Sequence, residues 1–177
     1  MLRDAARTAV ELFVHDRESG QRAKVDLGSN ADIYLARVDW SADGRTLYVQ
    51  RQSRDQKTLD LLSVDPATGA SRVILSQKAE AWVDLNNDFH VLPDGRFIWS
   101  NEDSGWRHLY LYDRNGRQLR AITRGDYPVK HLDGVNEQTG EVLPFYKYRM
   151  ENESGEVLAR GFTDSAGKTS RIHTAQG

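Results

Sequence analysis

Cysteine is absent from this 177-residue sequence, which excludes disulfide bonds and thiolate metal sites. Long apolar runs are absent too: no stretch approaches the roughly 18 residues of a membrane-spanning helix, so no membrane span is predicted. Residues 1–7 carry charges but no apolar segment, and they predict no signal peptide. Neither sign of charge dominates, because 24 Lys and Arg stand against 26 Asp and Glu. Electrostatics therefore gives no reason to expect nucleic acid as a partner.

What the sequence does contain is a repeat of two alternating motifs. The first is an apolar run followed by Asp, a short loop and Gly, and its aspartates recur at steps of 49, 48 and 51 residues. These aspartates are Asp16, Asp65, Asp113 and Asp164. The second motif, a Gly-containing turn that leads into a β-rich run, lies between the copies of the first. Its glycines are Gly44, Gly95 and Gly140.

Each motif is typical of a β-hairpin. Asp-Gly and Asn-Gly pairs supply the positive φ of tight turns, and β-branched or aromatic residues flank them. Two hairpins per period make four strands in roughly 45–50 residues, the size of one β-propeller blade. The sequence therefore predicts an all-β protein of propeller blades with four antiparallel strands each, about 3.5 blades in all. We expect a half blade at residues 9–28 and blades near 31–76, 79–125 and 127–175. Most propellers have more than four blades, so this is expected to be a partial propeller, a fragment.

One stretch carries a family resemblance. Residues 104–113 read Ser-Gly-Trp-Arg-His-Leu-Tyr-Leu-Tyr-Asp, and residues 119–129 follow with a turn and an aromatic-x-Val strand. Together they resemble a signature stretch of the N-terminal domain of dipeptidyl peptidase IV, of the prolyl oligopeptidase family. Trp82-Val83 and residues 91–95 fit the same layout. The resemblance covers residues 10–135 well and the rest loosely.

This resemblance implies a parent enzyme with two domains. The propeller of the family forms a gated chamber wall over a C-terminal α/β-hydrolase domain, whose Ser-Asp-His triad releases N-terminal X-Pro dipeptides. A pair of glutamates in the propeller holds the free amine of the peptide substrate. This sequence has no Gly-x-Ser-x-Gly nucleophile elbow and no adjacent Glu pair. We therefore expect a non-catalytic portion of a serine peptidase that shapes substrate access, with no catalytic residue, no cofactor and no activity alone.

The resemblance also indicates where substrate contacts would lie. Mammalian members of the family place a Phe and an Arg shortly after the Trp-Val pair, at the substrate chamber. Here those positions read Asn86-Asn87, so that contribution does not carry over. Trp82, Asn86 and Asn87 are the substrate-binding candidates, and the alternative interpretation of residues 86–88 is a turn before a strand.

The run Trp106-Arg107-His108 is aromatic and cationic, as in many binding sites. The structural interpretation has Trp106 packed between adjacent blades and Arg107 paired with a nearby acid such as Asp103 or Asp126.

The histidines predict no metal site. His90, His108 and His131 lie in different blade segments, without the close spacing of metal ligands. We expect them to be strand or loop residues bonded to the backbone.

Two other functions stay open. The turn at residues 40–44 also resembles the Ser-Pro-Asp-Gly turns of TolB-like propellers, which bind proteins without chemistry. A free-standing half propeller of that kind would assemble as a homodimer, since open strand edges invite association. A propeller with its own active site, such as a glycosidase or lactonase, needs clustered carboxylates or metal ligands, and no regular set is evident. The compartment, periplasm or cytoplasm of a bacterium, is left open as well.

Overall fold

The computed structural model describes residues 9–132, 134–136, 141–142, 147–151 and 157–162. All regular secondary structure in these ranges is β-strand, which confirms the all-β prediction. Within the same ranges, no helix is long and apolar enough to cross a membrane. The chain divides into two units, one that ends at Val129 and one that begins at Lys130.

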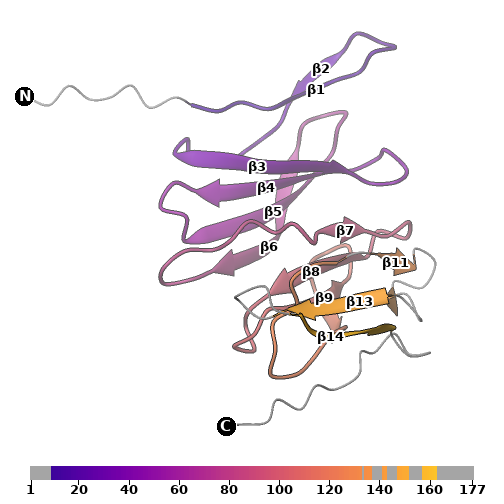
Figure 1. Ribbon diagram of the computed structural model, residues 1–177. Helices are drawn as coiled ribbons and strands as arrows, with labels where there is room; N and C mark the ends of the chain where they lie inside the picture. Colours follow the sequence, from indigo (N-terminus) through magenta and orange to yellow (C-terminus); the bar gives the residue numbers. More distant parts are fainter. Residues whose placement is uncertain (1–8, 133, 137–140, 143–146, 152–156, 163–177) are drawn as a thin grey trace, which may run out of the picture. The chain divides into compact units, whose positions relative to one another are not determined.

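The first unit contains one hairpin and two four-stranded sheets (Figure 1). The hairpin, called the half blade below, pairs β1 (Phe13–His15) with β2 (Arg22–Lys24). The first blade consists of β3 (Ile33–Trp40), β4 (Leu47–Ser53), β5 (Thr58–Val64) and β6 (Ser71–Lys78). The second blade consists of β7 (His90–Val91), β8 (Phe97–Asn101), β9 (His108–Tyr112) and β10 (Gln118–Ala121). In both blades each strand pairs antiparallel with the next one along the chain, which is the meander of a propeller blade.

The second unit holds two further antiparallel hairpins. One pairs β11 (Val135–Asn136) with β12 (Glu141–Val142), and the other pairs β13 (Lys147–Glu151) with β14 (Val157–Phe162). The blade predicted at residues 127–175 lies partly outside the described residues.

Strands of the first blade send alternate side chains into two cores, as the period of two in a strand requires. Along β4, Leu47 and Val49 belong to one core and Tyr48 to the other. The half-blade core, between the half blade and the first blade, consists of Val25, Leu27, Ile33, Leu47, Val49, Leu62 and Val64. The inter-blade core, between the two blades, consists of Tyr48, Leu59, Leu61, Ile74, Val83, Phe97, Trp99, Tyr110 and Tyr112.

In two copies of the Asp-to-Gly turn, the glycine lies against the preceding sheet. At Gly69 an added Cβ would lie 2.0 Å from the carbonyl oxygen of Lys24, and at Gly116 it would lie 1.6 Å from that of Ile74. Both glycines have positive φ, 77° and 85°. No other residue fits both the backbone conformation and the available space, so these two turns require glycine for the contact as well as for the positive φ.

Candidate functional site

The segment that joins the two blades, residues 79–89, carries all three predicted substrate contacts, and two glutamines of β4 hold its backbone. Gln52 Nε2 donates to the carbonyl oxygen of Val83 at 2.7 Å. Gln50 Nε2 donates to the carbonyl oxygen of Asn86 at 2.9 Å, and Gln50 Oε1 accepts from the Asn86 N–H at 3.3 Å. Both glutamines are buried. An unpaired buried amide costs about 1–3 kcal/mol, so these bonds fix the joining segment against the first blade.

The predicted contacts differ in exposure. Trp82 is 64% exposed, the highest value among the large apolar side chains of the described residues. Asn86 is only 3% exposed; its Nδ2 donates to the Ser100 carbonyl oxygen at 2.7 Å and its Oδ1 accepts from the Asp88 N–H at 3.1 Å. The fold thus presents Trp82 to solvent and uses the side chain of Asn86 internally.

Asn87 is exposed and bonds to a cation from the first blade. Arg37 of β3 donates from Nη2 to Asn87 Oδ1. Burial raises the pKa of Asp39 on the same strand, against the lowering effect of the Arg37 charge. We call the joining segment together with Arg37 the joint between the blades. It presents the amide of Asn87 and the guanidinium of Arg37, and it also carries the exposed indole of Trp82. These groups can donate hydrogen bonds to peptide carbonyls and pack against apolar side chains.

Arg107 pairs with an acid that the sequence did not indicate. Its Nη2 lies 2.6 Å from Asp88 Oδ2, and its Nε lies 3.3 Å from Ser100 Oγ. The prediction that Arg107 pairs with Asp103 or Asp126 was wrong. Those two carboxylates are exposed and remain solvated, whereas the Asp88 side chain is 1% exposed and needs a charged partner. The pair ties the start of β9 to the joining segment, with the carboxylate almost fully buried and the guanidinium partly exposed.

Trp106 is 42% exposed and does not belong to the core between the first and second blades. It lies in the tight turn between β8 and β9, where the Ser104 hydroxyl donates to its carbonyl oxygen at 3.0 Å.

The histidine rings of the blades have different surroundings. His108 is buried, with Nδ1 3.1 Å from Thr123 Oγ1 and Nε2 2.9 Å from the Gly125 carbonyl oxygen, which is the structural role expected for it. His90 Nε2 is buried with no hydrogen-bond partner among the described residues. In those residues no group of three or more His, Asp or Glu side chains is placed to hold a metal ion.

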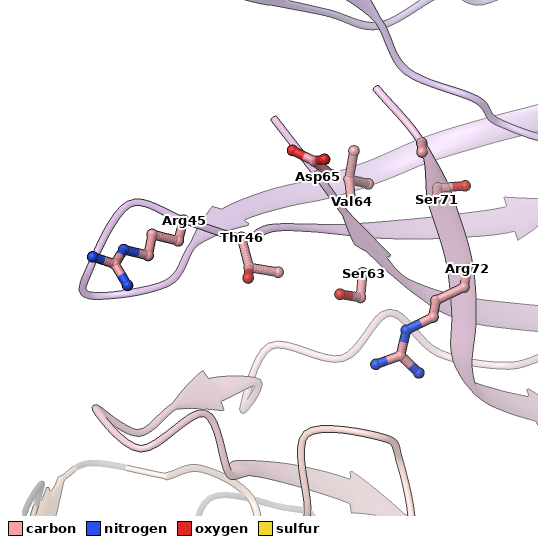
Figure 2. A pocket seen from close by; sticks show the side chains of 8 residues that line it. Arg45, Thr46, Ser63, Val64, Asp65, Ser71 and Arg72 are labelled. Carbon is pink, nitrogen blue, oxygen red and sulfur yellow. The ribbon is translucent and has the colours of Figure 1, made fainter. Parts of the chain in front are cut away.

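A shallow depression of about 310 Å³ lies on the first blade, between Arg45 and Arg72 (Figure 2). The hydroxyls of Thr46 and Ser63 lie between the two arginines in this view. The fold already uses several of its charges. Arg72 Nη2 donates to Asn115 Oδ1 at 2.9 Å. The N–H of Ala67 and the hydroxyl of Thr68 lower the pKa of the Asp65 carboxyl by bonding to it. Two of the charged groups that line the depression, Arg72 and Asp65, are thus engaged in inter-blade and turn contacts.

Sequence reasoning missed the residues that hold the joint. Gln50 and Gln52 could have been found from the sequence, because polar side chains at alternate positions of a strand lie on the same face of the sheet. Arg37 gave none, since its partner is 50 residues away in the sequence.

Comparison with known proteins identifies the family of the chain. Residues 4–146 match the family described as the dipeptidyl peptidase IV (DPP IV) N-terminal region. A probable dipeptidyl peptidase 4 of Aspergillus flavus is 25% identical over 127 residues, which cover 67% of this chain and 16% of that protein. Dipeptidyl peptidase 4 of Arthroderma otae is 26% identical over 114 residues, covering 61% of this chain and 15% of that protein. The chain thus spans about a sixth of the length of these relatives.

Two solved structures have similar folds. The crystal structure of Porphyromonas gingivalis dipeptidyl peptidase 4 matches with a TM-score of 0.65 and 26% identity, covering 72% of this chain and 18% of that one. A putative dipeptidyl aminopeptidase IV from Bacteroides ovatus matches with a TM-score of 0.67 and 20% identity, covering 86% and 24%. At 20% identity the second match supports the fold alone. The predicted resemblance to the family and the predicted all-β fold with four-stranded antiparallel sheets are confirmed.

Proposed function

The chain belongs to the family of dipeptidyl peptidase IV N-terminal regions, and from this membership we propose that it is a non-catalytic propeller section that shapes substrate access in a dipeptidyl peptidase. The hydrolytic triad belongs, in this proposal, to a C-terminal α/β-hydrolase domain of the parent enzyme. The peptide substrate reaches this chain only in that full-length enzyme.

The observation that supports the proposal is the construction of the joint between the blades. Buried amides of Gln50 and Gln52 immobilise the joining segment, yet Trp82 and Asn87 are left exposed on it. A rigid backbone with solvent-facing recognition groups is what a substrate-lining surface needs, because little conformational entropy is lost on binding.

The proposed roles are distinct. Trp82 offers an apolar ring to a substrate side chain such as proline. Asn87 and Arg37 offer N–H donors to peptide carbonyl groups. Asn86 contributes indirectly, as a positioning residue whose buried side chain holds the segment to β8.

An exchange of propeller segments tests this function. The matched segment of Porphyromonas gingivalis dipeptidyl peptidase 4 is replaced by the corresponding residues of this chain, and release of a Gly-Pro dipeptide from a chromogenic anilide is followed. We expect hydrolysis by the chimera and none by this chain alone. A correctly folded chimera that does not hydrolyse the anilide would overturn the proposal.

Within the active chimera, Trp82→Ala tests the assigned site. We expect KM to rise about fivefold with little change in kcat, which is the signature of lost ground-state binding. Trp106→Ala is the matched control, since Trp106 is another exposed indole that lies in a different turn. An equal rise in KM for both variants would remove Trp82 from the substrate path.

A further inference from the structure

One residue of the first blade has a backbone conformation that its side chain opposes. Gln56, in the turn between β4 and β5, has a φ of 59°, and every other described residue with positive φ is a glycine. The turn between β8 and β9 of the second blade is equivalent: the Gln56 N–H bonds to the Ser53 carbonyl oxygen, as the Gly105 N–H bonds to that of Glu102. Gly105 has a φ of 87° at the same position. The fold therefore accepts glycine here, whereas the left-handed conformation strains a glutamine.

The strained turn holds the segment that carries Trp82. The Val83 N–H donates to the Gln56 carbonyl oxygen at 2.7 Å, and the Ala79 N–H donates to the Lys57 carbonyl oxygen at 3.1 Å. The turn supplies only backbone groups to these two bonds, and a glycine at position 56 would supply them equally. The side chain of Gln56 is thus not needed to hold the segment.

The side-chain amide of Gln56 is available to a ligand. Gln56 is exposed, and this amide has no hydrogen-bond partner among the described residues. A glutamine amide accepts through its oxygen and donates through its nitrogen, so it can bond to both the N–H and the C=O of a peptide main chain. Backbone strain that the fold does not require is a reason to look for a function of the side chain.

An aromatic ring and a guanidinium stack beside the same turn. Tyr34 is paired with Gln52 across β3 and β4, so both side chains lie on the face of the sheet to which Val83 is bonded. The Arg54 guanidinium carbon lies 4.2 Å from the centre of the Tyr34 ring. Arg54 Nε also lies 3.0 Å from Asp32 Oδ1. The ring is therefore held by a cation on one side, yet Tyr34 remains 38% exposed.

These groups flank the residue that follows Trp82, because Val83 bonds to Gln56 through its N–H and to Gln52 through its carbonyl oxygen. We call Tyr34, Arg54, Gln56 and Trp82 the turn patch. Trp, Tyr and Arg are enriched among the residues that contribute most to binding, and the rings offer large areas with few rotatable bonds. The turn patch thus combines two exposed rings with an amide that has no internal partner.

We propose that the turn patch is a second peptide-binding subsite, in which Gln56 binds the main chain of an extended peptide and Tyr34 contacts one of its apolar side chains. Alternate side chains of an extended peptide point to the same face. A proline on Trp82 is therefore accompanied by the side chain two residues further on, which packs against Tyr34. This subsite rests on the proposed function for its ligand, a peptide substrate that extends beyond the released dipeptide.

Peptide titration into the isotope-labelled full chain tests the subsite. The probe is the peptide Gly-Pro-Ala-Phe-Ala with an amidated C-terminus, and the amidated dipeptide Gly-Pro is the control ligand. We expect saturable shifts of the side-chain amide signals of Gln56 and of the indole signal of Trp82. The dipeptide should bind about tenfold more weakly, equivalent to about 1.4 kcal/mol. Equal affinity for the two ligands, or no saturable shift of the Gln56 amide, would overturn the proposal.

Gln56→Gly is the most informative variant, because it keeps the backbone conformation and relieves its strain. It should weaken binding of the longer peptide about fivefold, equivalent to about 1 kcal/mol, while the urea midpoint rises. Such a loss of affinity cannot come from partial unfolding. Gln56→Asn keeps an amide and tolerates positive φ, so it should bind more tightly than Gln56→Gly. An unchanged affinity in Gln56→Gly would refute the role of the glutamine.

Tyr34→Leu tests the ring. It should weaken binding of the longer peptide about threefold, equivalent to about 0.7 kcal/mol, and leave binding of the dipeptide unchanged. Tyr127→Leu is the matched control, since Tyr127 is 40% exposed but lies after β10, outside the turn patch. Equal losses in the two variants would show that the peptide adheres to any exposed ring and would contradict the subsite.

The active chimera tests the proposed function separately. Hydrolysis that depends on Trp82, together with normal peptide binding by the Gln56→Gly chain, would refute the subsite and leave the proposed function standing. Absence of hydrolysis, together with binding that depends on Gln56, would support the subsite and refute the role in a peptidase.

Discussion

The hairpins β1–β2 and β5–β6 carry the same turn, but only the second turn lies against a neighbouring sheet. In both, the side chain of the turn aspartate accepts the N–H two residues on, at 2.8 Å for Asp16 and 2.9 Å for Asp65. The closing bond from the glycine N–H to the aspartate carbonyl is 2.9 Å for Gly20 and 2.8 Å for Gly69. The surroundings differ: Gly69 meets the Lys24 carbonyl, whereas Gly20 meets no described residue within 4 Å.

The difference separates two levels of structure. Residues within the turn determine its backbone conformation, because every bond in it is local. The preceding sheet determines how much the turn contributes to stability, since only a neighbour can make the glycine indispensable. Substitutions at corresponding positions of the two hairpins therefore measure the contribution of the neighbour alone.

The largest difference is expected between two leucines. Leu61 and Leu12 each lie four residues before the turn aspartate, but Leu61 is 0% exposed and Leu12 is half-buried. Leu61→Ala should lower the free energy of unfolding by about 2–5 kcal/mol, as cavity formation in a closed core does. Leu12→Ala should lower it by about 1–2 kcal/mol. Urea unfolding of the full chain measures both, and equal losses would show that the half blade is as well packed as the first blade.

Gly69→Ala compared with Gly20→Ala comes next. An alanine at positive φ costs about 1 kcal/mol at either site, and at Gly69 the clash with a backbone carbonyl adds about 1–3 kcal/mol of overpacking. Thermal unfolding should therefore show a much larger loss for Gly69→Ala, with Gly116→Ala behaving in the same way. A cost at Gly20 as large as that at Gly69 would mean that the half blade already has a neighbour in solution.

The sequence was sufficient for whatever is local to a turn or strand. The Asp-to-Gly and Asp-Gly turns and the apolar runs beside them predicted the two four-stranded blades, because a hairpin is encoded by adjacent residues. It was insufficient where a partner is distant. Arg107 was expected to pair with a nearby acid, yet its partner Asp88 lies 19 residues upstream and is selected by burial.

The candidate site shows the same limit. Trp82 was predicted from a resemblance, and the structure shows it exposed on a segment whose backbone is hydrogen-bonded to buried glutamines. Asn86 and Asn87 were treated alike, since adjacent residues of one type look alike in a sequence. In the fold their side chains diverge, one buried against β8 and the other exposed beside Arg37. Only the path of the backbone distinguishes them.

A smaller effect is expected in the turns between the second and third strands of the two blades. Gln56 and Gly105 occupy corresponding positions in the β4–β5 and β8–β9 turns, and both have positive φ, 59° and 87°. Gln56→Gly should stabilise the chain by up to about 1 kcal/mol because it relieves left-handed strain. Gly105→Ala should cost about 1 kcal/mol and no more, since a Cβ there meets nothing within 4 Å. A loss above about 3 kcal/mol at Gly105, measured by urea unfolding, would reveal a contact absent from the described residues.

The smallest difference is expected in how the stability of the chain depends on pH in the acid range. Hydrogen bonds lower the pKa of both turn aspartates. The largest contribution comes from the Ser19 hydroxyl for Asp16 and from the Ala67 N–H for Asp65. A carboxyl with a lowered pKa binds protons less readily in the folded state, so its stabilising contribution is complete above the ordinary value of 3.8 and is lost as the pH falls below it. Asp16→Asn and Asp65→Asn should each flatten the fall of the urea midpoint between about pH 4 and about pH 2. Both carboxyls are fully exposed and bonded within their own turns, so the two variants should flatten it equally. A distinctly larger change for Asp65→Asn would show that the preceding sheet governs the electrostatics of the turn as well as its packing.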